Sequence, residues 1–269
     1  MTRKRLGMVA LVSLALSLTL VLAAAGCGDK KEEKPVEPEK PKLSGTLNIS
    51  GSTTVLPLAQ EAADMFMDEN PDVTVNVQGG GSSVGISNVA EGVVHIGNSS
   101  RGLKDEEKNL GLVEHKIALD VIVLIAHKDV PVSDLTADQV HKIFTGKTNN
   151  WKDVGGPDAA ITVVVRDEAS GTREMFDEKA LKKEKPKAGA IECNSNGIVR
   201  QTVASTPNSI GYVSLGYLDN SVKALAYGGV KGSKETAVNK TYPLSRFLYM
   251  FTKGEATGLT KAYIDFVLS

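Results

Sequence analysis

Serine, threonine and glycine residues gather at several points where an apolar stretch of the chain ends. The hydroxyl-bearing residues in these turns are Ser52, Thr53, Thr54, Ser82, Ser83, Ser99, Ser100, Ser170 and Thr172. One capping hydroxyl is expected at the start of any helix. Runs of two or three, with glycines that let the backbone approach closely, instead suit a pocket in which many neutral donors surround a small oxyanion. The residues alone thus indicate an anion site, with helix capping as the alternative.

Arg166 stands in the strongest of these turns. It follows an apolar run that begins at Val163, and a helical pattern with Ser170, Gly171 and Thr172 in its first turn comes next. An arginine beside the free N–H groups of a helix start favours an oxyanion. We expect Arg166 to supply the one full positive charge and Glu168 to hold its guanidinium in place.

Patterns that could indicate an enzyme are incomplete. Gly81–Gly85 has the spacing of a nucleophile elbow, and a hydrolase of that kind needs an acid and then a histidine further along the chain. The last histidine is His141, which falls inside a helical pattern with about 130 residues still to come. Gly146-Lys147-Thr148 resembles the end of a phosphate-binding P-loop but lacks the first glycine. We expect no enzyme, although a phosphatase or other hydrolase using Ser83 or Thr53 stays open as an alternative.

Charge and metal-ligand content exclude further classes of function. Residues 1–26 carry three of the 31 basic residues and none of the 32 acidic ones, so the rest of the chain has a net charge of −4. A mildly acidic chain has no global field that gathers nucleic acid. The histidines are not paired with one another or with Cys193, so no metal site is predicted. No cofactor is expected.

The elements that must position the turns alternate between strand and helix. Strand patterns occur at 46–50, 73–77, 93–96, 117–126, 163–166, 191–194, 210–215 and 247–252, and helical patterns follow most of them. This alternation predicts an α/β protein. The runs 117–126 and 247–252 are nearly continuously apolar, and we expect them to lie side by side and carry the chain between two lobes.

The first 42 residues differ from the rest. Residues 1–26 combine a basic start, an apolar run and small residues before Cys27, which is the pattern of a lipoprotein signal peptide whose cleavage leaves a lipidated Cys27. A retained membrane anchor is the alternative, since roughly 20 apolar residues can span a bilayer. Residues 27–42 are rich in charge and proline, which predicts a disordered tether. The folded part is expected outside the cytoplasm, attached to the membrane.

Six motifs along residues 43–269 resemble those of the phosphate-binding proteins of bacterial phosphate ABC transporters, which are two-lobed periplasmic binding proteins of type II. The motifs are Gly51–Thr54, Gly80–Ser83, Ile96–Arg101, Ile143–Gly146 with Asn150-Trp151, Arg166–Thr172 and Ser209–Ser214. The resemblance implies two lobes, each a central sheet flanked by helices, joined by a two-strand hinge. It places lobe 1 at 43–119 plus 246–269 and lobe 2 at 120–245.

The resemblance also implies the ligand and its partners. Inorganic phosphate would be held between the lobes, and an ABC permease would receive it from a monomeric protein anchored to the bilayer through Cys27. The implied phosphate-binding residues are Ser52, Thr53, Thr54, Ser82 and Ser100 in one lobe and Arg166, Ser170, Gly171 and Thr172 in the other.

One position departs from the family pattern. Many members carry an aspartate where this chain has Ser100, and that carboxylate accepts the proton of hydrogen phosphate and repels sulfate. Asp167 and Glu168 are candidate replacement acceptors, and the sequence does not choose between them. A binder of sulfate, molybdate or tungstate, and a phosphate sensor that signals rather than transports, therefore remain alternatives.

Overall fold

The computed structural model describes residues 42–269. The predicted signal peptide 1–26, Cys27 and the predicted tether apart from Lys42 lie outside the described residues. None of the helices in the described part of the chain is both long and apolar enough to cross a membrane.

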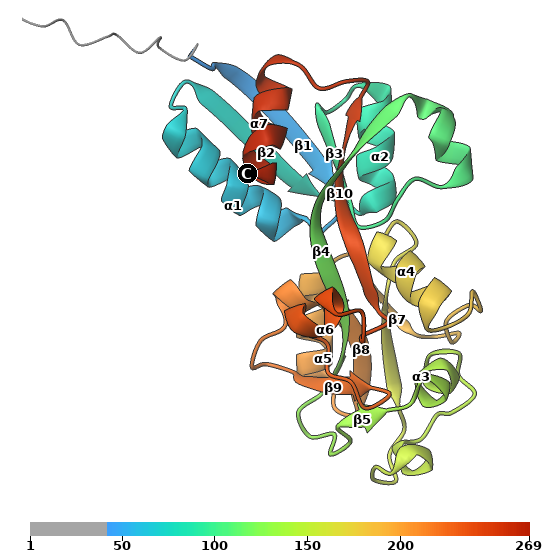
Figure 1. Ribbon diagram of the computed structural model, residues 1–269. Coiled ribbons are helices and arrows are strands. Elements are labelled where there is room, and N and C mark those ends of the chain that lie inside the picture. Colours follow the sequence, from blue (N-terminus) through green and yellow to red (C-terminus); the bar gives the residue numbers. More distant parts are fainter. Residues whose placement is uncertain (1–41) are drawn as a thin grey trace, which may run out of the picture. The chain divides into compact units, whose positions relative to one another are not determined.

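One group of elements, which we call the N-terminal lobe, surrounds a mixed sheet with the strand order β2-β1-β3-β10-β4. The strands are β1 (Gly45–Gly51), β2 (Val73–Gly79), β3 (Ile96–Ser99), β10 (Ser245–Lys253) and the first part of β4 (Leu112–Ala126). Helices α1 (Leu56–Glu69) and α7 (Gly258–Leu268) pack on the face that carries Leu47 and Ile49, and α2 (Ser82–Glu91) packs with Phe251 in a separate cluster (Figure 1). The carboxyl ends of β1, β2 and β3 thus meet at one edge, where their loops gather.

The second group, the C-terminal lobe, continues the sheet from β4 in the order β4-β8-β6-β7. Its strands are β8 (Ser209–Ser214), β6 (Thr162–Arg166) and β7 (Ile191–Cys193), with β9 (Lys223–Tyr227) and β5 (Asp134–Leu135) beside them. The helices are α3 (Ala137–Phe144), α4 (Gly171–Lys179), α5 (Asn196–Ser205) and α6 (Lys234–Val238), and η1 (Asp105–Leu110), η2 (Trp151–Val154) and η3 (Leu215–Tyr217) are short 3-10 turns, of which η1 belongs to the N-terminal lobe. One apolar cluster fills this lobe.

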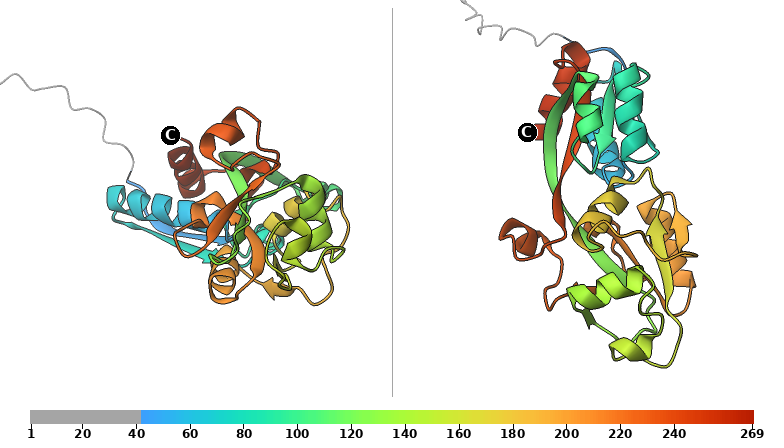
Figure 2. Two further views of the ribbon diagram at one scale, coloured as in Figure 1. Left: turned by 90° about the horizontal axis from the view of Figure 1, so that it is seen from below. Right: turned by 90° about the vertical axis from the view of Figure 1, so that its right-hand side faces the viewer.

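Strands β4 and β10 run side by side between the two lobes, β4 in green and β10 in red (Figures 1 and 2). They pair antiparallel from Ser245 opposite Val121 to Lys253 opposite Leu112. The prediction that 117–126 and 247–252 are neighbours is confirmed, but the pairing lies nearer the start of β4 than predicted. Of the run 117–126, only the part up to Val121 pairs with β10. The later half of β4 pairs with β8 and β9 instead, so this one long strand carries the sheet from the N-terminal lobe into the C-terminal lobe.

The third strand begins later than predicted. The expected range was 93–96, whereas β3 spans Ile96–Ser99. Val93 is 62% exposed and lies in the turn after α2, so its apolar character does not mark a strand. Because of this shift, Gly97, Asn98 and Ser99 are strand residues, and Ser100 is the first residue after the strand.

Glycines allow α2 to approach the sheet closely. A Cβ atom added at Gly85 would lie 2.6 Å from the carbonyl oxygen of Asn98 and 2.8 Å from the Cα of Gly51. Such distances are far below a normal contact, so only glycine fits. The glycine that completes the apparent nucleophile elbow is therefore explained by packing of helix on strand.

Candidate anion-binding site

The loop after β1 carries the first group of predicted ligands. Ser52, Thr53 and Thr54 are 2%, 6% and 6% exposed. The N–H of Ser52 donates to the carbonyl of Asn98 (2.8 Å), and the N–H of Thr54 donates to Ser52 Oγ (3.2 Å). The Ser52 hydroxyl therefore closes the turn, whereas Thr53 and Thr54 extend toward the C-terminal lobe.

Ser82 and Ser100 form a second buried pair. Ser82 is the first residue of α2 and Ser100 follows β3, and both are at most 1% exposed. Ser82 Oγ accepts the N–H of Ser100 (3.0 Å) and lies 3.2 Å from Ser100 Oγ. Both hydroxyls lie against the start of α4, since a Cβ atom added at Gly171 would be 2.5 Å from Ser82 Oγ and 2.9 Å from Ser100 Oγ.

The start of α4 faces these two serines. Ser170 is its N-cap, with its side chain accepting the N–H of Arg173 at 3.2 Å, so this hydroxyl serves the capping role that the sequence left open. Gly171 leaves room for Ser82 and Ser100, as its missing Cβ shows. Thr172 Oγ1 lies 2.8 Å from Thr54 Oγ1, which joins the two lobes through a pair of hydroxyls.

Arg166, the last residue of β6, is 1% exposed. Its Nε donates to the carbonyl of Cys193 (3.2 Å) and its Nη2 to the carbonyl of Asn194 (3.1 Å). Within residues 42–269 no carboxylate forms an ion pair with it. Burial lowers the pKa of Arg166, and the positive charge of Arg246 adds to this lowering while Asp167 opposes it.

The prediction that Glu168 holds Arg166 is wrong. The Glu168 side chain is exposed, and the carbonyls of Cys193 and Asn194 hold the guanidinium instead. Residues in the turn after a strand point in different directions, so nearness along the sequence did not bring the two side chains together. Of the two candidate proton acceptors, Asp167 is the one whose charge acts on Arg166.

A second buried arginine, Arg246, was not predicted from the sequence. Arg246 on β10 lies directly opposite Asp120 on β4, and their side chains are 3% and 6% exposed. Nε and Nη2 of Arg246 both donate to Asp120 Oδ2, at 3.1 and 2.9 Å. Burial lowers the pKa of Arg246, and Asp120 opposes this effect. Asp120 inside the apolar run 117–126 and Arg246 directly before the run 247–252 were the available signal.

Arg246 also reaches residues of both lobes. Its Nη1 donates to the carbonyl of Gly171 (2.9 Å). Its Nη2 contacts Thr172 Oγ1 at 2.8 Å and Thr54 Oγ1 at 3.3 Å. The hinge strand therefore contributes a cation to the floor of the site.

Asn196 is the other residue that the sequence did not single out for the site. It is the first residue of α5 and is fully buried. Its Nδ2 donates to Thr53 Oγ1 (3.2 Å) and Thr54 Oγ1 (3.0 Å) across the two lobes. Tyr217 makes a similar crossing, donating its hydroxyl to the carbonyl of Thr53 at 2.6 Å.

A charged contact between the lobes lies beside Ser100. Arg101 Nε is 2.9 Å from Glu174 Oε2 on α4, and Lys104 Nζ is 3.3 Å from the same oxygen. Glu107 holds the guanidinium of Arg101 in place, with an Nη1–Oε2 distance of 2.6 Å. Ser83 Oγ, the hydroxyl considered as a nucleophile, accepts from Nη2 of Arg101 at 3.2 Å.

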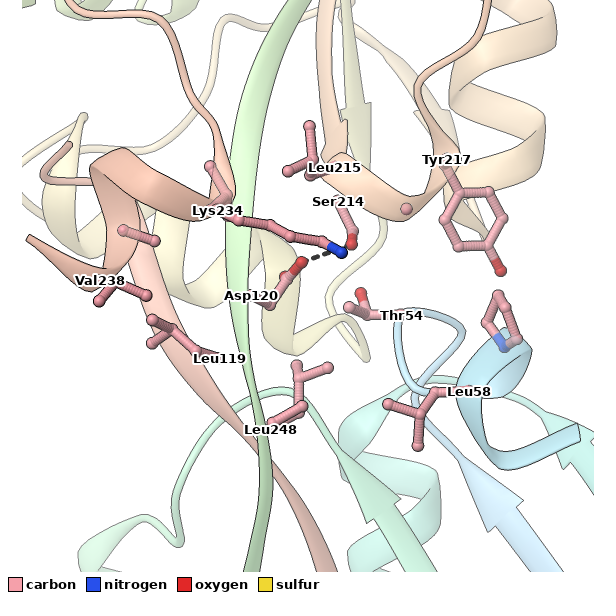
Figure 3. Close-up of a pocket in the computed structure, with 15 residues that line it drawn as sticks. Thr54, Leu58, Leu119, Asp120, Ser214, Leu215, Tyr217, Lys234, Val238 and Leu248 are labelled. Atoms are coloured by element: carbon pink, nitrogen blue, oxygen red, sulfur yellow. Dashed lines mark hydrogen bonds between the residues drawn. The ribbon is translucent and has the colours of Figure 1, made fainter. Parts of the chain in front are cut away.

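A cavity of about 560 Å³ lies next to the site, lined by Thr54 and by residues of the hinge strands such as Asp120 and Leu248. Figure 3 shows Asp120 and Ser214 pointing toward one another in its wall, with Thr54 nearby. Ser214 Oγ donates to Asp120 Oδ1 at 2.6 Å. Leu58, Leu119, Val238 and Leu248 make much of the wall apolar, and Thr54, Tyr217 and Lys234 add polar groups to it.

Chemically, the arrangement is a set of donors around a buried cation. The predicted residues Thr53, Thr54, Ser82, Ser100, Gly171 and Thr172 come together between the lobes, while Ser52 and Ser170 close local turns. Arg166 lies at the end of β6, close enough to Arg246 for the two positive charges to act on each other. The described residues contain no cluster of histidine, cysteine, aspartate or glutamate that could hold a metal ion.

Comparisons with known proteins place the chain in a family. The PBP superfamily domain matches residues 36–269. The phosphate-binding protein PstS of Bacillus subtilis is 41% identical over 266 residues, covering 96% of this chain and 88% of that protein. PstS of Borreliella burgdorferi is 34% identical over 236 residues, covering 83% of this chain and 84% of that protein.

Solved structures of phosphate-binding proteins have the same fold as this chain. A phosphate ABC transporter substrate-binding protein of Clostridium perfringens with bound phosphate has a TM-score of 0.81 and 44% identity, covering 84% of this chain and 93% of that one. An ABC-type phosphate transport receptor of Vibrio cholerae has a TM-score of 0.70 and 32% identity, covering 83% of this chain and 93% of that one. The chain therefore belongs to the PBP superfamily, with an α/β fold of the two-lobed type II periplasmic binding proteins, and within it to the family of the phosphate-binding protein PstS.

Proposed function

We propose that this protein captures inorganic phosphate between its two lobes and delivers it to a membrane-embedded ABC permease. The observation that carries the proposal is Arg166, a guanidinium that is 1% exposed and has only neutral carbonyls as partners in the described part of the chain. A buried charge is costly unless an opposite charge compensates it. An anionic ligand would supply that compensation.

The neighbours of Arg166 suit phosphate. Buried hydroxyls from two lobes, the N-terminus of α4 and the N-terminus of α5 provide many neutral donors, which is how a small oxyanion is held in a dry site. We propose Ser52, Thr53, Thr54, Ser82, Ser100, Arg166, Ser170, Gly171 and Thr172 as the residues of the binding site. The relatives of B. subtilis and B. burgdorferi are named phosphate-binding proteins, and the C. perfringens structure contains phosphate.

Release of the ligand requires the lobes to separate. The division into lobe 1 (43–119 plus 246–269) and lobe 2 (120–245) puts β4 and β10 at the crossing, and rotation about two strands is a typical hinge. The hydrogen bonds from Asn196 and Tyr217 to Thr53 would break on opening. Phosphate would favour the closed arrangement by touching both lobes.

The proposed location follows from the sequence. Cleavage after residue 26 would leave Cys27 as a lipidated first residue, and residues 27–42 would act as the tether between the bilayer and the folded part. The protein would then act as a monomer outside the cytoplasm, anchored to the cell membrane, without a cofactor.

A second candidate ligand is another oxyanion, because Ser100 stands where the family resemblance leads us to expect an aspartate. Calorimetric titration of the purified protein with phosphate, sulfate and molybdate between pH 5 and 8 separates the two. We expect saturable phosphate binding at one site and much weaker binding of the other two anions. Failure of phosphate to bind, or sulfate binding equally well, would contradict the proposed function.

A further inference from the structure

Asn196 has an amide whose orientation is fixed by its surroundings. Its Oδ1 accepts the backbone N–H of Ser214 at 3.1 Å. A backbone N–H can only donate, so the oxygen of the amide must face it and the NH₂ group must face the other way. The two protons of Nδ2 then go to Thr53 Oγ1 and Thr54 Oγ1.

The guanidinium of Arg246, the other donor to Thr54, also has a fixed orientation. Asp120 Oδ2 accepts from both Nε and Nη2 of this guanidinium, and Asp120 itself is fixed by the hydroxyl of Ser214 (Figure 3). The two protons of Nη2 have three acceptors, namely Asp120, Thr172 Oγ1 at 2.8 Å and the more distant Thr54 Oγ1 at 3.3 Å. Thr172 thus receives a full hydrogen bond and Thr54 a shared one.

These donors decide the direction of the bond between Thr54 and Thr172. A hydroxyl oxygen has two lone pairs and one proton. Thr54 Oγ1 uses its lone pairs for Asn196 and Arg246, so its own proton must go to Thr172 Oγ1, 2.8 Å away. Thr172 Oγ1 then accepts from Thr54 and Arg246, which leaves its proton as a donor to a further group.

The pair Ser82 and Ser100 differs in this respect. Ser82 Oγ accepts one N–H, that of Ser100, and either hydroxyl can donate across the 3.2 Å between them. No fixed donor imposes a direction on this pair among the described residues. It can therefore turn to accept a proton, whereas the threonine pair cannot.

We infer that Asn196 and Arg246 are positioning residues that fix the direction of the hydrogen bond from Thr54 to Thr172, so that the Thr172 hydroxyl donates toward the bound anion. This inference rests on the proposed function. Thr172 then donates to an oxygen of hydrogen phosphate, and it cannot accept the proton of the P–OH group, because both lone pairs of its Oγ1 are already used by Thr54 and Arg246. The side of the site away from Thr172 must accept the proton.

The substitution Asn196→Asp tests this assignment. An ionised carboxylate still accepts the N–H of Ser214, but it would accept from Thr53 and Thr54 rather than donate to them, which reverses the threonine pair. Protonation of the introduced acid restores a donor. We expect phosphate affinity to fall at least about tenfold at pH 8, the size of one lost hydrogen bond and more, and to recover toward the unsubstituted protein at pH 5.

Calorimetric titration with phosphate at pH 8 and pH 5 is the measurement, and Asn220→Asp is the matched control. Asn220 is exposed and lies in the same lobe, so it introduces the same charge without touching the threonines. The control should follow the unsubstituted protein at both pH values. An Asn196→Asp variant with unchanged affinity, or with the same relative loss at both pH values, would overturn the inference while leaving the proposed function intact.

A folding defect can be separated from this effect. Trp151 is fully buried in the core of the C-terminal lobe, so its fluorescence reports unfolding of the variant. If Asn196→Asp does not fold, Asn196→Ala removes the donor without adding a charge and should weaken phosphate about tenfold at both pH values. Binding as tight as in the unsubstituted protein would overturn the inference. Failure of the unsubstituted protein to bind phosphate would overturn the proposed function as well.

Discussion

Two buried arginines, Arg166 in the C-terminal lobe and Arg246 on the hinge strand, occupy similar depths but differ in charge balance. Arg246 has a carboxylate partner, Asp120, at 2.9 Å. Arg166 has two backbone carbonyls and no carboxylate partner among residues 42–269. A neutralised pair can serve the architecture of the hinge, while a buried cation that forms no ion pair within residues 42–269 is suited to a ligand that arrives with its own charge.

The comparison predicts that loss of Arg246 harms the fold. Arg246→Met leaves Asp120 buried without its partner, and breaking a buried pair in this way costs roughly 3–5 kcal/mol of unfolding free energy. Denaturant unfolding followed by circular dichroism measures it. The double substitution Asp120→Leu with Arg246→Met should recover most of the loss, because no charge remains buried. If Arg246→Met alone is no less stable than the double variant, then leaving Asp120 buried without its partner costs no stability, and the prediction is wrong.

The opposite result is expected for Arg166. Arg166→Met should weaken phosphate by roughly 2–5 kcal/mol, the usual effect of removing one partner of a desolvated charge pair. It should not lower the unfolding free energy of the ligand-free protein, because an uncompensated buried charge is removed. Calorimetric titration measures the loss of phosphate affinity, and denaturant unfolding measures the unfolding free energy of the ligand-free protein. Weaker folding with unchanged affinity would make Arg166 a structural residue.

Gly171 tests how closely the two lobes must approach. A Cβ atom at this position would collide with Ser82 Oγ and Ser100 Oγ across the cleft. Gly171→Ala should weaken phosphate by about 1–3 kcal/mol, as overpacking does, without lowering the unfolding free energy, since alanine is the better helix residue. Gly197→Ala is the matched control, because its nearest neighbour would be 3.8 Å away. Equal affinities for both variants would argue against closure onto Gly171.

The smallest effect is expected at Glu174. Its side chain is 38% exposed and pairs with Arg101 and Lys104 across the cleft. Glu174→Gln should weaken phosphate by about 0.2–1 kcal/mol, and the difference should shrink as salt is added. Titration in low and high sodium chloride measures this. A large effect that is insensitive to salt would mean that Glu174 acts on the ligand itself.

Much of the site could be predicted from the sequence because its loops carry local signals. The turns around Thr53, Ser82 and Thr172 each follow an apolar strand and precede a helix, and the structure places all three between the lobes. Thr136 is the N-cap of α3 and forms a capping box with Gln139, which is another local signal of this kind. Local patterns such as these need no knowledge of distant contacts.

The missed features depend on contacts between distant parts of the chain. Arg246 and Asp120 are 126 residues apart, and only the pairing of β10 with β4 brings them together. The register is shifted from the expected overlap, so the sequence could not place one opposite the other. Strands β5 and β9 and the five-residue helix α6 carry too few periodic positions to be recognised. Glu168 was assigned to Arg166 on sequence proximity alone, and the turn directs it to the surface.

The account as a whole rests on an anion held between the lobes against Arg166. The most direct test is a crystal structure of the protein with arsenate, a tetrahedral analogue of phosphate whose arsenic atom is located by anomalous scattering. We predict a single strong peak within hydrogen-bond reach of the Arg166 guanidinium, with Thr172 and Ser82 on opposite sides of the anion. A peak in the hinge cavity or on the surface, with none beside Arg166, would contradict the account.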